Sequence, residues 1–449
     1  MLLDPTIFKA YDVRGIYPSS LNEDVAYHFG RAFVTFLKAK TVVVGYDARL
    51  SSPKLKKALE RGLCEQGAKV IDIGLCTSPL LNFTVASHSE YNSGIMITAS
   101  HNPASYNGFK TCRSDASAIG SENGLLEIKE IMVKQNYPLS SPGHTEKINP
   151  LPFYIDYLKG LIDFAQIRDL KVVVDVSNGS AGQQVQEIFK ELDCTIIPLN
   201  FKPDGRFPHH EPDPLKEENL TQIKEKVKKE KADLGIILDG DADRVRFIDE
   251  KGNAVPADLI TAFLIKRFLK QEKKSAVVYD LRSSLVVKEE IEKYNGRPVI
   301  CRVGHTFIKQ KMRETKAIFG GEVSGHYYFR DLFYTDNADY AYLILMSLLK
   351  QTKESFSGIM RPYRRYFQTE ELNFEVEDQK SVLENIENYY AQKYPDLKIS
   401  QLDGLSIYLP EFWFNVRPSN TEPVLRVKLE ASTDKLREEK TKELISLIK

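Results

Sequence analysis

The sequence predicts an α/β fold: three tandem related α/β domains with mixed sheets, followed by a smaller C-terminal α+β domain, arranged around a central cleft. Three observations predict it. A length of 449 residues exceeds what one hydrophobic core usually holds, which favours two to four domains. A sequence pattern typical of a strand followed by a loop occurs three times along the chain, and the segment after Arg361 follows a different pattern.

Each copy of the repeated sequence pattern is a run of β-branched residues that ends in a polar loop. The copies are Thr41 to Ser52, Lys171 to Gly179 and Ser275 to Ser284. Continuous apolar runs are typical of strands covered on both faces, and the helix-like stretches Pro53 to Gln66 and Leu285 to Tyr294 follow two of them. The repetition predicts three related α/β units in tandem.

Each repeat then supplies a second predicted strand that runs into a loop rich in polar side chains. These strands are Gly94 to Ile97, Leu234 to Leu238 and Ala317 to Phe319. Their loops are Thr98 to Pro103, Asp239 to Arg244 and Gly320 to His326. Because α/β sheets bind ligands at the carboxyl ends of their strands, we expect these loops to carry the chemistry.

The last part of the chain reads as a strand and a helix across Phe374 to Tyr394, followed by strands that pair with one another. Those strands are Leu405 to Leu409, Trp413 to Val416 and Val424 to Leu429. Stretches rich in turn residues suggest the boundaries. We predict four domains, at residues 1–150, 151–251, 252–362 and 363–449.

The charge balance and the cysteines exclude several classes of protein. The chain has 62 basic and 62 acidic residues, so no net charge attracts nucleic acid or membrane lipid. Its 5 cysteines are widely spaced and form no CxxC pair, which favours reduced thiols over disulfides or zinc. No stretch reaches the roughly 18 uncharged apolar residues of a membrane span. We expect a cytoplasmic protein with no nucleic-acid or membrane partner.

Asp239, Asp241 and Asp243 crowd three carboxylates into one short loop. They repel one another unless a hard cation neutralises them, and oxygen ligands suit magnesium. The spacing also matches a calcium-binding EF-hand loop, but Arg244 occupies the position of the required glycine and the flanks read as strands. A solvated acidic turn is the remaining alternative.

Ser100 lies at a predicted strand end, beside His101 and before the turn-forming Asn102-Pro103. A neighbouring serine and histidine by themselves do not make a nucleophile, because a catalytic triad takes its histidine from elsewhere in the chain. Judged alone, this loop is structural.

Taken together, these loops resemble those of the α-D-phosphohexomutase superfamily, which includes phosphomannomutases and phosphoglucomutases. The resemblance rests on five segments in the family's order and spans nearly the whole chain. They are Phe8-Lys-Ala-Tyr-Asp-Val-Arg-Gly15, Thr98-Ala-Ser-His-Asn-Pro103, Asp239-Gly-Asp-Ala-Asp-Arg244, Gly320-Gly-Glu-Val-Ser-Gly-His326 and Arg417-Pro-Ser-Asn-Thr-Glu-Pro423.

The resemblance implies that Ser100 carries the phosphoryl group and that His101 assists as acid or base. It implies Mg²⁺ on Asp239, Asp241 and Asp243, with a phosphate oxygen on Ser100 completing the set of ligands. The metal would neutralise charge on the transferring phosphoryl group. Further catalytic residues implied in the cleft are Arg14, Lys110, His305 and His326.

The remaining implied site residues bind the substrate. Glu322 and Ser324 would hydrogen-bond sugar hydroxyls. The phosphate that is not reacting would be held by Arg417, Ser419, Asn420 and Thr421, because a guanidinium, hydroxyls and an amide complement a phosphate dianion. Arg244 and Arg282 would contact the substrate or its phosphate. Asp47, Arg49 and Ser52, in the first copy of the repeated sequence pattern, are interpreted as structural.

Two positions depart from the commonest family pattern. Ala242 replaces a glycine, which fits unless the backbone there needs a positive φ. Arg282 stands where relatives often have lysine, a change that would tune the site because the two cations differ in geometry and hydration.

The resemblance therefore implies a mutase that interconverts hexose 6-phosphate and hexose 1-phosphate through phosphoserine and a hexose 1,6-bisphosphate. Glu322-Val-Ser-Gly-His326 favours mannose, with glucose as a second substrate, because a loop that grips O3 and O4 does not distinguish sugars that differ at C2. The alternatives are a phosphoglucosamine mutase, a magnesium-dependent sugar phosphatase or a non-catalytic sugar-phosphate sensor. We expect a monomer or homodimer.

Overall fold

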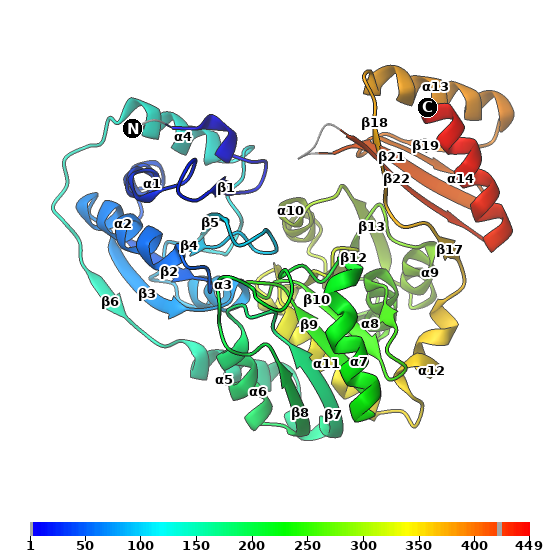
Figure 1. The fold of residues 1–449 in the computed structure, drawn as a ribbon, viewed down its shortest axis with the longest axis horizontal. Helices are drawn as coiled ribbons and strands as arrows, with labels where there is room; N and C mark the ends of the chain where they lie inside the picture. The colour runs from blue at the N-terminus through cyan, green and yellow to red at the C-terminus, as the bar shows by residue number, and fades with distance from the viewer. Residues whose placement is uncertain (1–2, 420–423) are drawn as a thin grey trace. The chain divides into compact units, whose positions relative to one another are not determined.

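The computed structural model describes residues 3–419 and 424–449 and divides into two compact units. The first unit runs to Ala257 and also includes Ser324–Ile359; the second holds Asp258–Val323 and Met360–Lys449. Figure 1 colours the elements along the chain. The predicted fold class is confirmed, because α/β repeats are followed by a C-terminal domain built on an antiparallel sheet.

The first repeat is a mixed sheet in the order β1-β5-β4-β2-β3-β6. Strands β2, β3, β4 and β6 run parallel to one another, and β5 pairs antiparallel with both β4 and β1. Its strands are β1 (Val13–Ile16), β2 (Thr41–Tyr46), β3 (Lys69–Leu75), β4 (Ser93–Ile97), β5 (Tyr106–Arg113) and β6 (Thr145–Lys147). Its helices are α1 (Glu23–Leu37), α2 (Ser52–Glu65), α3 (Ser78–Ala86) and α4 (Leu125–Lys134).

Local sequence explains where these helices start. The Asn22 side chain accepts hydrogen bonds from the backbone N–H groups of Asp24 and Val25 and caps α1, and the Thr77 hydroxyl caps α3 in the same way. Helices α1 and α2 contribute apolar side chains to one core with the sheet, where the Phe29 and Phe109 rings stack at 4.8 Å. This core holds the sheet in place, and the carboxyl ends of the parallel strands β2 and β4 lie next to each other on it.

The second repeat is a sheet in the order β11-β10-β9-β7-β8. Its central strand, β9, is a fully buried apolar run, as the sequence predicts. Its strands are β7 (Arg168–Asp175), β8 (Asp193–Leu199), β9 (Leu234–Leu238), β10 (Val245–Asp249) and β11 (Ala254–Val255), and its helices are α5 (Leu151–Leu161), α6 (Gly182–Lys190) and α7 (Thr221–Glu230).

The stretch Ser324–Ile359 packs with these two repeats in the first unit. It forms the antiparallel strands β15 (Tyr327–Phe329) and β16 (Thr335–Asp336), then α11 (Ala338–Lys350), and α12 (Phe356–Met360) closes it. Nearly every side chain of α11 is buried, so the helix is a core element of the unit.

The second unit contains the remaining part of the third repeat, with β13 and β14 parallel to β12 on either side. Its elements are α8 (Ala257–Gln271), β12 (Ala276–Asp280), α9 (Leu285–Lys293), β13 (Arg297–Cys301), α10 (His305–Thr315) and β14 (Phe319–Gly321). The prediction of this last strand was two residues early. The two glycines suggested a loop, yet a Cβ on Gly321 would lie 2.1 Å from the Thr261 hydroxyl of α8, so close packing requires glycine within the strand.

The C-terminal domain has an antiparallel sheet in the order β17-β22-β21-β20-β19, with β18 also paired to β22. Helices α13 and α14 supply Tyr390 and Leu444 to its core. Its elements are β17 (Phe367–Gln368), β18 (Leu372–Glu375), α13 (Gln379–Lys393), β19 (Lys398–Ser400), β20 (Leu405–Tyr408), β21 (Phe412–Pro418), β22 (Val424–Ala431) and α14 (Asp434–Ile448).

Candidate active site

The three aspartates of the second repeat lie in the turn that joins β9 to β10. Asp239, Asp241 and Asp243 are all buried, and one carboxylate oxygen from each lies within 4.8 Å of the others. Burial and repulsion from the two neighbouring carboxylates raise the pKa of Asp239 well above its usual value. Burial alone would also raise the pKa of Asp243, but Lys110 and His326 hold it well below its usual value. The cluster therefore crowds three carboxyl groups out of water, where a bound cation would favour their ionised forms.

Lys110 of β5 partly neutralises this cluster. Its Nζ lies 2.6 Å from Asp241 Oδ2 and 2.5 Å from Asp243 Oδ2. The other carboxylate oxygen of Asp241, Oδ1, is buried and makes no hydrogen bond to the part of the chain that the structure describes. A buried carboxylate oxygen without a partner beside two further carboxylates fits a hard divalent cation.

The flanks of this loop exclude an EF-hand, which requires helices on both sides. Strands β9 and β10 pair as a hairpin, with Leu238 opposite Val245. The Glu250 carboxylate, which would be the last ligand of an EF-hand loop, instead accepts hydrogen bonds from the backbone N–H and the hydroxyl of Ser357 at 2.9 and 2.5 Å. The burial of all three aspartates likewise excludes a solvated acidic turn.

Ser100 stands just beyond β4 with its hydroxyl pointing at this cluster. Its Oγ donates a hydrogen bond to Asp239 Oδ2 at 2.7 Å and lies 3.3 Å from His101 Nδ1. The side chain is 1% exposed, and the backbone is left-handed, with φ = 50°. Burial and the cations Arg244, Arg14 and Lys110 lower the pKa of His101 well below its usual value, so its imidazole is neutral.

Two arginines predicted for the site also lie near this hydroxyl. Arg14 of β1 contacts Asp12 through Nε at 2.8 Å and donates a hydrogen bond from Nη1 to the Asn102 side chain. Arg244 Nε lies 4.0 Å from Asp239 Oδ2. Arg14 therefore contacts the loop that carries Ser100, and Arg244 lies beside the aspartate that the Ser100 hydroxyl contacts.

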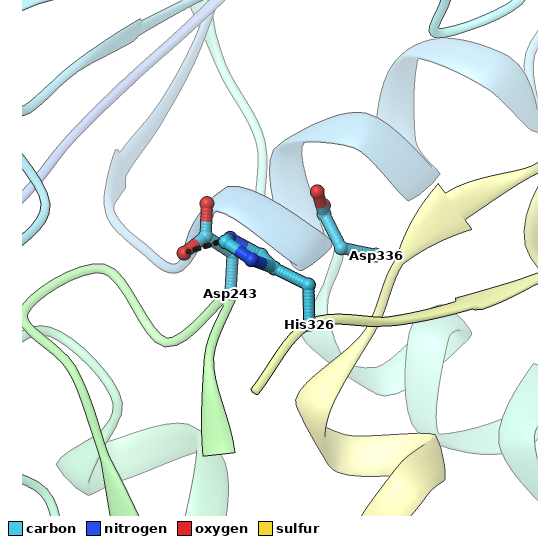
Figure 2. A group of neighbouring side chains, drawn as sticks. All are labelled: Asp243, His326 and Asp336. Atoms are coloured by element: carbon cyan, nitrogen blue, oxygen red, sulfur yellow. Dashed lines mark ion pairs between the residues drawn. The ribbon is translucent and has the colours of Figure 1, made fainter. Parts of the chain in front are cut away.

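Ser324 and His326 approach the aspartates from the start of β15. The Ser324 hydroxyl lies 2.8 Å from His326 Nδ1, and His326 Nε2 forms an ion pair with Asp243 Oδ1 at 3.4 Å. Asp243, His326 and Asp336, at the end of β16, form a second group of side chains that could hold a metal ion, and one possible ligand atom from each lies within 4.8 Å of the others. Figure 2 shows the three side chains, with the His326–Asp243 ion pair dashed.

The other predicted site residues lie in the second unit. Arg282 follows β12, with Nη2 2.9 Å from Asp280 Oδ2 and 3.5 Å from Glu322 Oε1. His305 opens α10. Arg417 and Ser419 lie at the end of β21, whereas Asn420 and Thr421 fall outside the described residues.

Glu371 joins the arginines of the second unit. Its carboxylate lies 3.1 Å from Arg417 Nη2, 3.2 Å from Arg426 Nη1 and 3.5 Å from Arg282 Nη1. Burial would raise the pKa of Glu371, but these three arginines outweigh burial and lower it. Guanidinium groups gathered around one carboxylate have the geometry and charge to bind a phosphate.

Sequence reasoning missed Asp336, Glu371 and Ser78. The Ser78 backbone N–H donates to the carbonyl oxygen of Asp241 at 2.9 Å, and its hydroxyl donates to Asp241 Oδ2 at 2.6 Å. Ser78 follows the cap residue of α3 and Asp336 precedes the cap residue of α11, positions where short polar residues are common for local reasons. No pattern in the sequence signals their contacts with residues far along the chain.

The fold and this site together define the phosphohexomutase class of isomerases. Residues 5–138, 152–252 and 256–366 match alpha/beta/alpha domains I, II and III of the family described as phosphoglucomutase/phosphomannomutase, and residues 371–446 match its C-terminal domain. The chain belongs to this family and is an enzyme that transfers a phosphoryl group intramolecularly.

Similar proteins cover the whole chain. A phosphomannomutase of Methanocaldococcus jannaschii is 38% identical over 452 residues, which cover 100% of this chain and 98% of that protein. One from Escherichia coli is 37% identical over 455 residues, covering 99% of each. The crystal structure of a phosphoglucomutase/phosphomannomutase family protein from Burkholderia thailandensis has a TM-score of 0.91 at 30% identity, covering 99% of this chain and 97% of that one. Within the described residues, no helix is long and apolar enough to cross a membrane.

Proposed function

We propose that this enzyme interconverts hexose 6-phosphate and hexose 1-phosphate through a phosphoserine at Ser100, with mannose as the preferred sugar and glucose as a second substrate. The observation that carries the proposal is the 2.7 Å hydrogen bond from the Ser100 hydroxyl to Asp239 within a buried set of three aspartates. The preference for mannose rests on the loop Glu322 to His326 and on the similar proteins named phosphomannomutase.

Asp239, Asp241 and Asp243 would hold Mg²⁺, together with a phosphate oxygen on Ser100. The buried Oδ1 of Asp241 supports this assignment. When bound, the metal would supply positive charge against the charge that develops on the transferring phosphoryl group. Lys110, Arg14 and Arg244 would add positive charge around the same position.

In the first transfer, the bond between Ser100 Oγ and phosphorus breaks while the free hydroxyl oxygen of the sugar forms the new bond to phosphorus. The hydroxyl proton is taken up by His101, which delivers a proton to the departing Ser100 oxygen; we assign this role to His101 because its Nδ1 lies 3.3 Å from Oγ. The product is a hexose 1,6-bisphosphate. After it turns around, Ser100 Oγ forms a bond to the other phosphorus while the bond from that phosphorus to the sugar oxygen breaks, and the Ser100 hydroxyl proton passes through His101 to the departing sugar oxygen.

The remaining residues would bind the sugar phosphate. Arg417, Ser419, Asn420 and Thr421 would hold the phosphate that is not reacting, assisted by Arg282. Glu322 and Ser324 would select the sugar hydroxyls, and His305 and His326 would assist the chemistry. A structurally similar N-acetylphosphoglucosamine mutase of Aspergillus fumigatus, in a variant form, is known in complex with glucose 1,6-bisphosphate, which supports a bisphosphate intermediate here. The enzyme would work in the cytoplasm, as a monomer or homodimer, with all of its cysteines reduced.

The test is a coupled assay of mannose 1-phosphate and glucose 1-phosphate isomerisation with Mg²⁺ and a trace of hexose 1,6-bisphosphate. Ser100→Ala should lower turnover by several orders of magnitude. Ser93→Ala is the matched control, because Ser93 is a buried serine of β4, the strand that leads to Ser100, and its hydroxyl has no hydrogen-bond partner in the described structure.

The outcomes separate the proposal from its alternatives. Turnover in wild type and Ser93→Ala with loss in Ser100→Ala supports the mutase, and the rate ratio of the two sugars identifies the preferred one. Steady release of inorganic phosphate without isomerisation would indicate a phosphatase. Faster turnover of glucosamine 1-phosphate would indicate a glucosamine mutase, and binding without turnover would indicate a sensor.

A further inference from the structure

Arg49 is buried directly beneath the loop that carries Ser100. It lies between β2 and α2, is 1% exposed, and none of the proposed substrate-binding or metal-binding roles uses it. A loop of the second repeat covers it, with the Phe207 ring 5.1 Å from the guanidinium carbon. An arginine sealed from solvent in this way requires partners for its charge and its donors.

The guanidinium of Arg49 uses all five of its N–H groups within the protein. Nε forms an ion pair with Asp47 Oδ2 at 3.0 Å. The other four N–H groups donate to backbone carbonyl oxygens of the Ser100 loop. These carbonyls belong to Ser100 at 2.8 Å, Asn102 at 2.6 Å, Pro103 at 2.6 Å and Tyr106 at 3.0 Å. No donor of Arg49 remains to bind a ligand, so its partner is the loop itself.

The Asp47 carboxylate also holds the same loop, through Thr98. Its Oδ2 accepts a hydrogen bond from the Thr98 hydroxyl at 2.8 Å, and the Thr98 oxygen accepts one from the Ser100 backbone N–H at 2.8 Å. Its Oδ1 accepts a hydrogen bond from the Ser52 hydroxyl at 2.6 Å. The backbone N–H and C=O of Ser100 are therefore both fixed by one buried ion pair, Asp47 and Arg49.

This support matters because Ser100 adopts a left-handed backbone conformation, with φ = 50°. For a residue other than glycine, that conformation costs about 1–2 kcal/mol and persists only where the surroundings enforce it. With its backbone held on both sides, the Ser100 Oγ is directed at Asp239. The planar guanidinium of Arg49 has five donors for four carbonyl oxygens and one carboxylate oxygen. A lysine at position 49 would have one compact charge and only three donors, so it could not bind all five of these oxygens.

We propose that Arg49, together with Asp47 and Thr98, is a positioning residue that fixes the Ser100 hydroxyl for phosphoryl transfer. The inference rests on the proposed function, because it needs Ser100 as the phosphoryl carrier, and it extends that function to a buried group that touches neither substrate nor metal. Misplacing a reacting atom by about 1 Å costs about 100-fold in rate. Loss of this support should therefore lower kcat while the substrate-binding residues, and with them KM, are unchanged.

The test measures Ser100 phosphorylation of the full-length enzyme by glucose 1,6-bisphosphate, using quenched reactions and intact mass, together with kcat and KM. Arg49→Lys should slow phosphorylation and kcat by about 100-fold and change KM by less than about threefold. Arg31→Lys is the matched control, because Arg31 is a partly buried arginine of the same repeat that donates to Gln66 at 3.1 Å and does not contact the loop. It should keep wild-type kcat.

A second pair of variants tests the inference independently of the folding of Arg49→Lys. Thr98→Val removes the hydroxyl that links Asp47 to the Ser100 N–H at nearly constant volume, and should lower kcat without changing KM. Thr98→Ser keeps the hydroxyl and should restore kcat. Circular dichroism shows which variants are folded at the assay temperature.

Two results distinguish the possible failures. If wild type accepts no phosphate on Ser100, the proposed function is wrong. If wild type is phosphorylated and the folded Arg49→Lys or Thr98→Val enzyme matches its rate, the positioning role is wrong. The same conclusion follows if these variants change only KM, or if Arg31→Lys loses as much kcat as Arg49→Lys.

Discussion

Replacing Lys110 with methionine should make the stability of the enzyme depend strongly on Mg²⁺. Lys110 Nζ contacts both Asp241 and Asp243, at 2.6 and 2.5 Å, and its side chain is only 15% exposed. Methionine has a similar length and no charge. Lys110→Met therefore leaves three buried aspartates without their closest cation in the metal-free protein.

The size of the effect follows from these distances. Two unit charges about 2.6 Å apart attract by about 6 kcal/mol at an effective dielectric constant of about 20, and desolvation of the ammonium group offsets part of this. Removing one partner of such a buried pair costs about 3–5 kcal/mol. We expect this loss in EDTA. A divalent cation replaces the missing charge, so it should bind Lys110→Met more tightly and recover most of the loss.

Urea unfolding followed by circular dichroism, in EDTA and in Mg²⁺, measures this difference, and calorimetry measures Mg²⁺ affinity. Lys56→Met is the matched control: Lys56 is 14% exposed and bridges Asp72 at 2.6 Å and Glu60 at 3.0 Å, away from the aspartate loop. That variant should lose stability equally with and without Mg²⁺. The reasoning is refuted if Lys110→Met and Lys56→Met respond to Mg²⁺ alike, or if Mg²⁺ binds Lys110→Met more weakly than wild type.

Three further perturbations test other parts of the structure. Glu371→Gln removes a carboxylate that competes with phosphate for Arg417. Calorimetry with inorganic phosphate should therefore show about tenfold tighter binding, as expected from the loss of one charge-assisted hydrogen bond. Weaker binding would mean that Glu371 orients the arginine for its ligand. Burial raises the pKa of Asp339 from 3.8 to about 6, so the folded protein keeps this proton to a higher pH than the unfolded chain. The unfolding free energy of wild type should therefore fall by about 3 kcal/mol relative to Asp339→Asn as pH rises from about 4 to about 7, and parallel urea curves for the two proteins across that range would contradict it. Ala242→Gly should raise the unfolding free energy in EDTA by about 0.5–1 kcal/mol, because Ala242 has φ = 56°, and a decrease would show that the turn does not strain alanine.

The strand-and-loop organisation of this chain could be predicted because its local signals agree. The apolar run before Asp239 is bounded by polar residues on both sides, and β9 begins and ends where that run does. The strand β14 was misplaced because the reason for its glycines is the distant Thr261, which no local pattern reports. Local periodicity thus located the loops better than the exact strand ends.

The contacts within the site were harder to predict, because they join residues far apart in the sequence. The resemblance placed Ser100 and the aspartates together, and the structure brings Ser100 within hydrogen-bonding distance of Asp239. Ala242 shows the limit of such reasoning. It was expected to fit unless a positive φ was needed, and the turn does adopt a positive φ there. The catalytic roles of these residues stay predictions.

The discontinuity of the first unit has a consequence for how the enzyme is made. Ser100 and the three aspartates are translated before residue 257, whereas Ser324, His326 and Asp336 follow an intervening segment of the other unit. The two ends of that segment meet within the first unit, where the Tyr327 hydroxyl lies 3.3 Å from the carbonyl oxygen of Ala257. A ribosome must therefore finish most of the chain before this half of the active site can close. Products of premature termination up to that point carry the serine and the aspartates without the histidine that supports them.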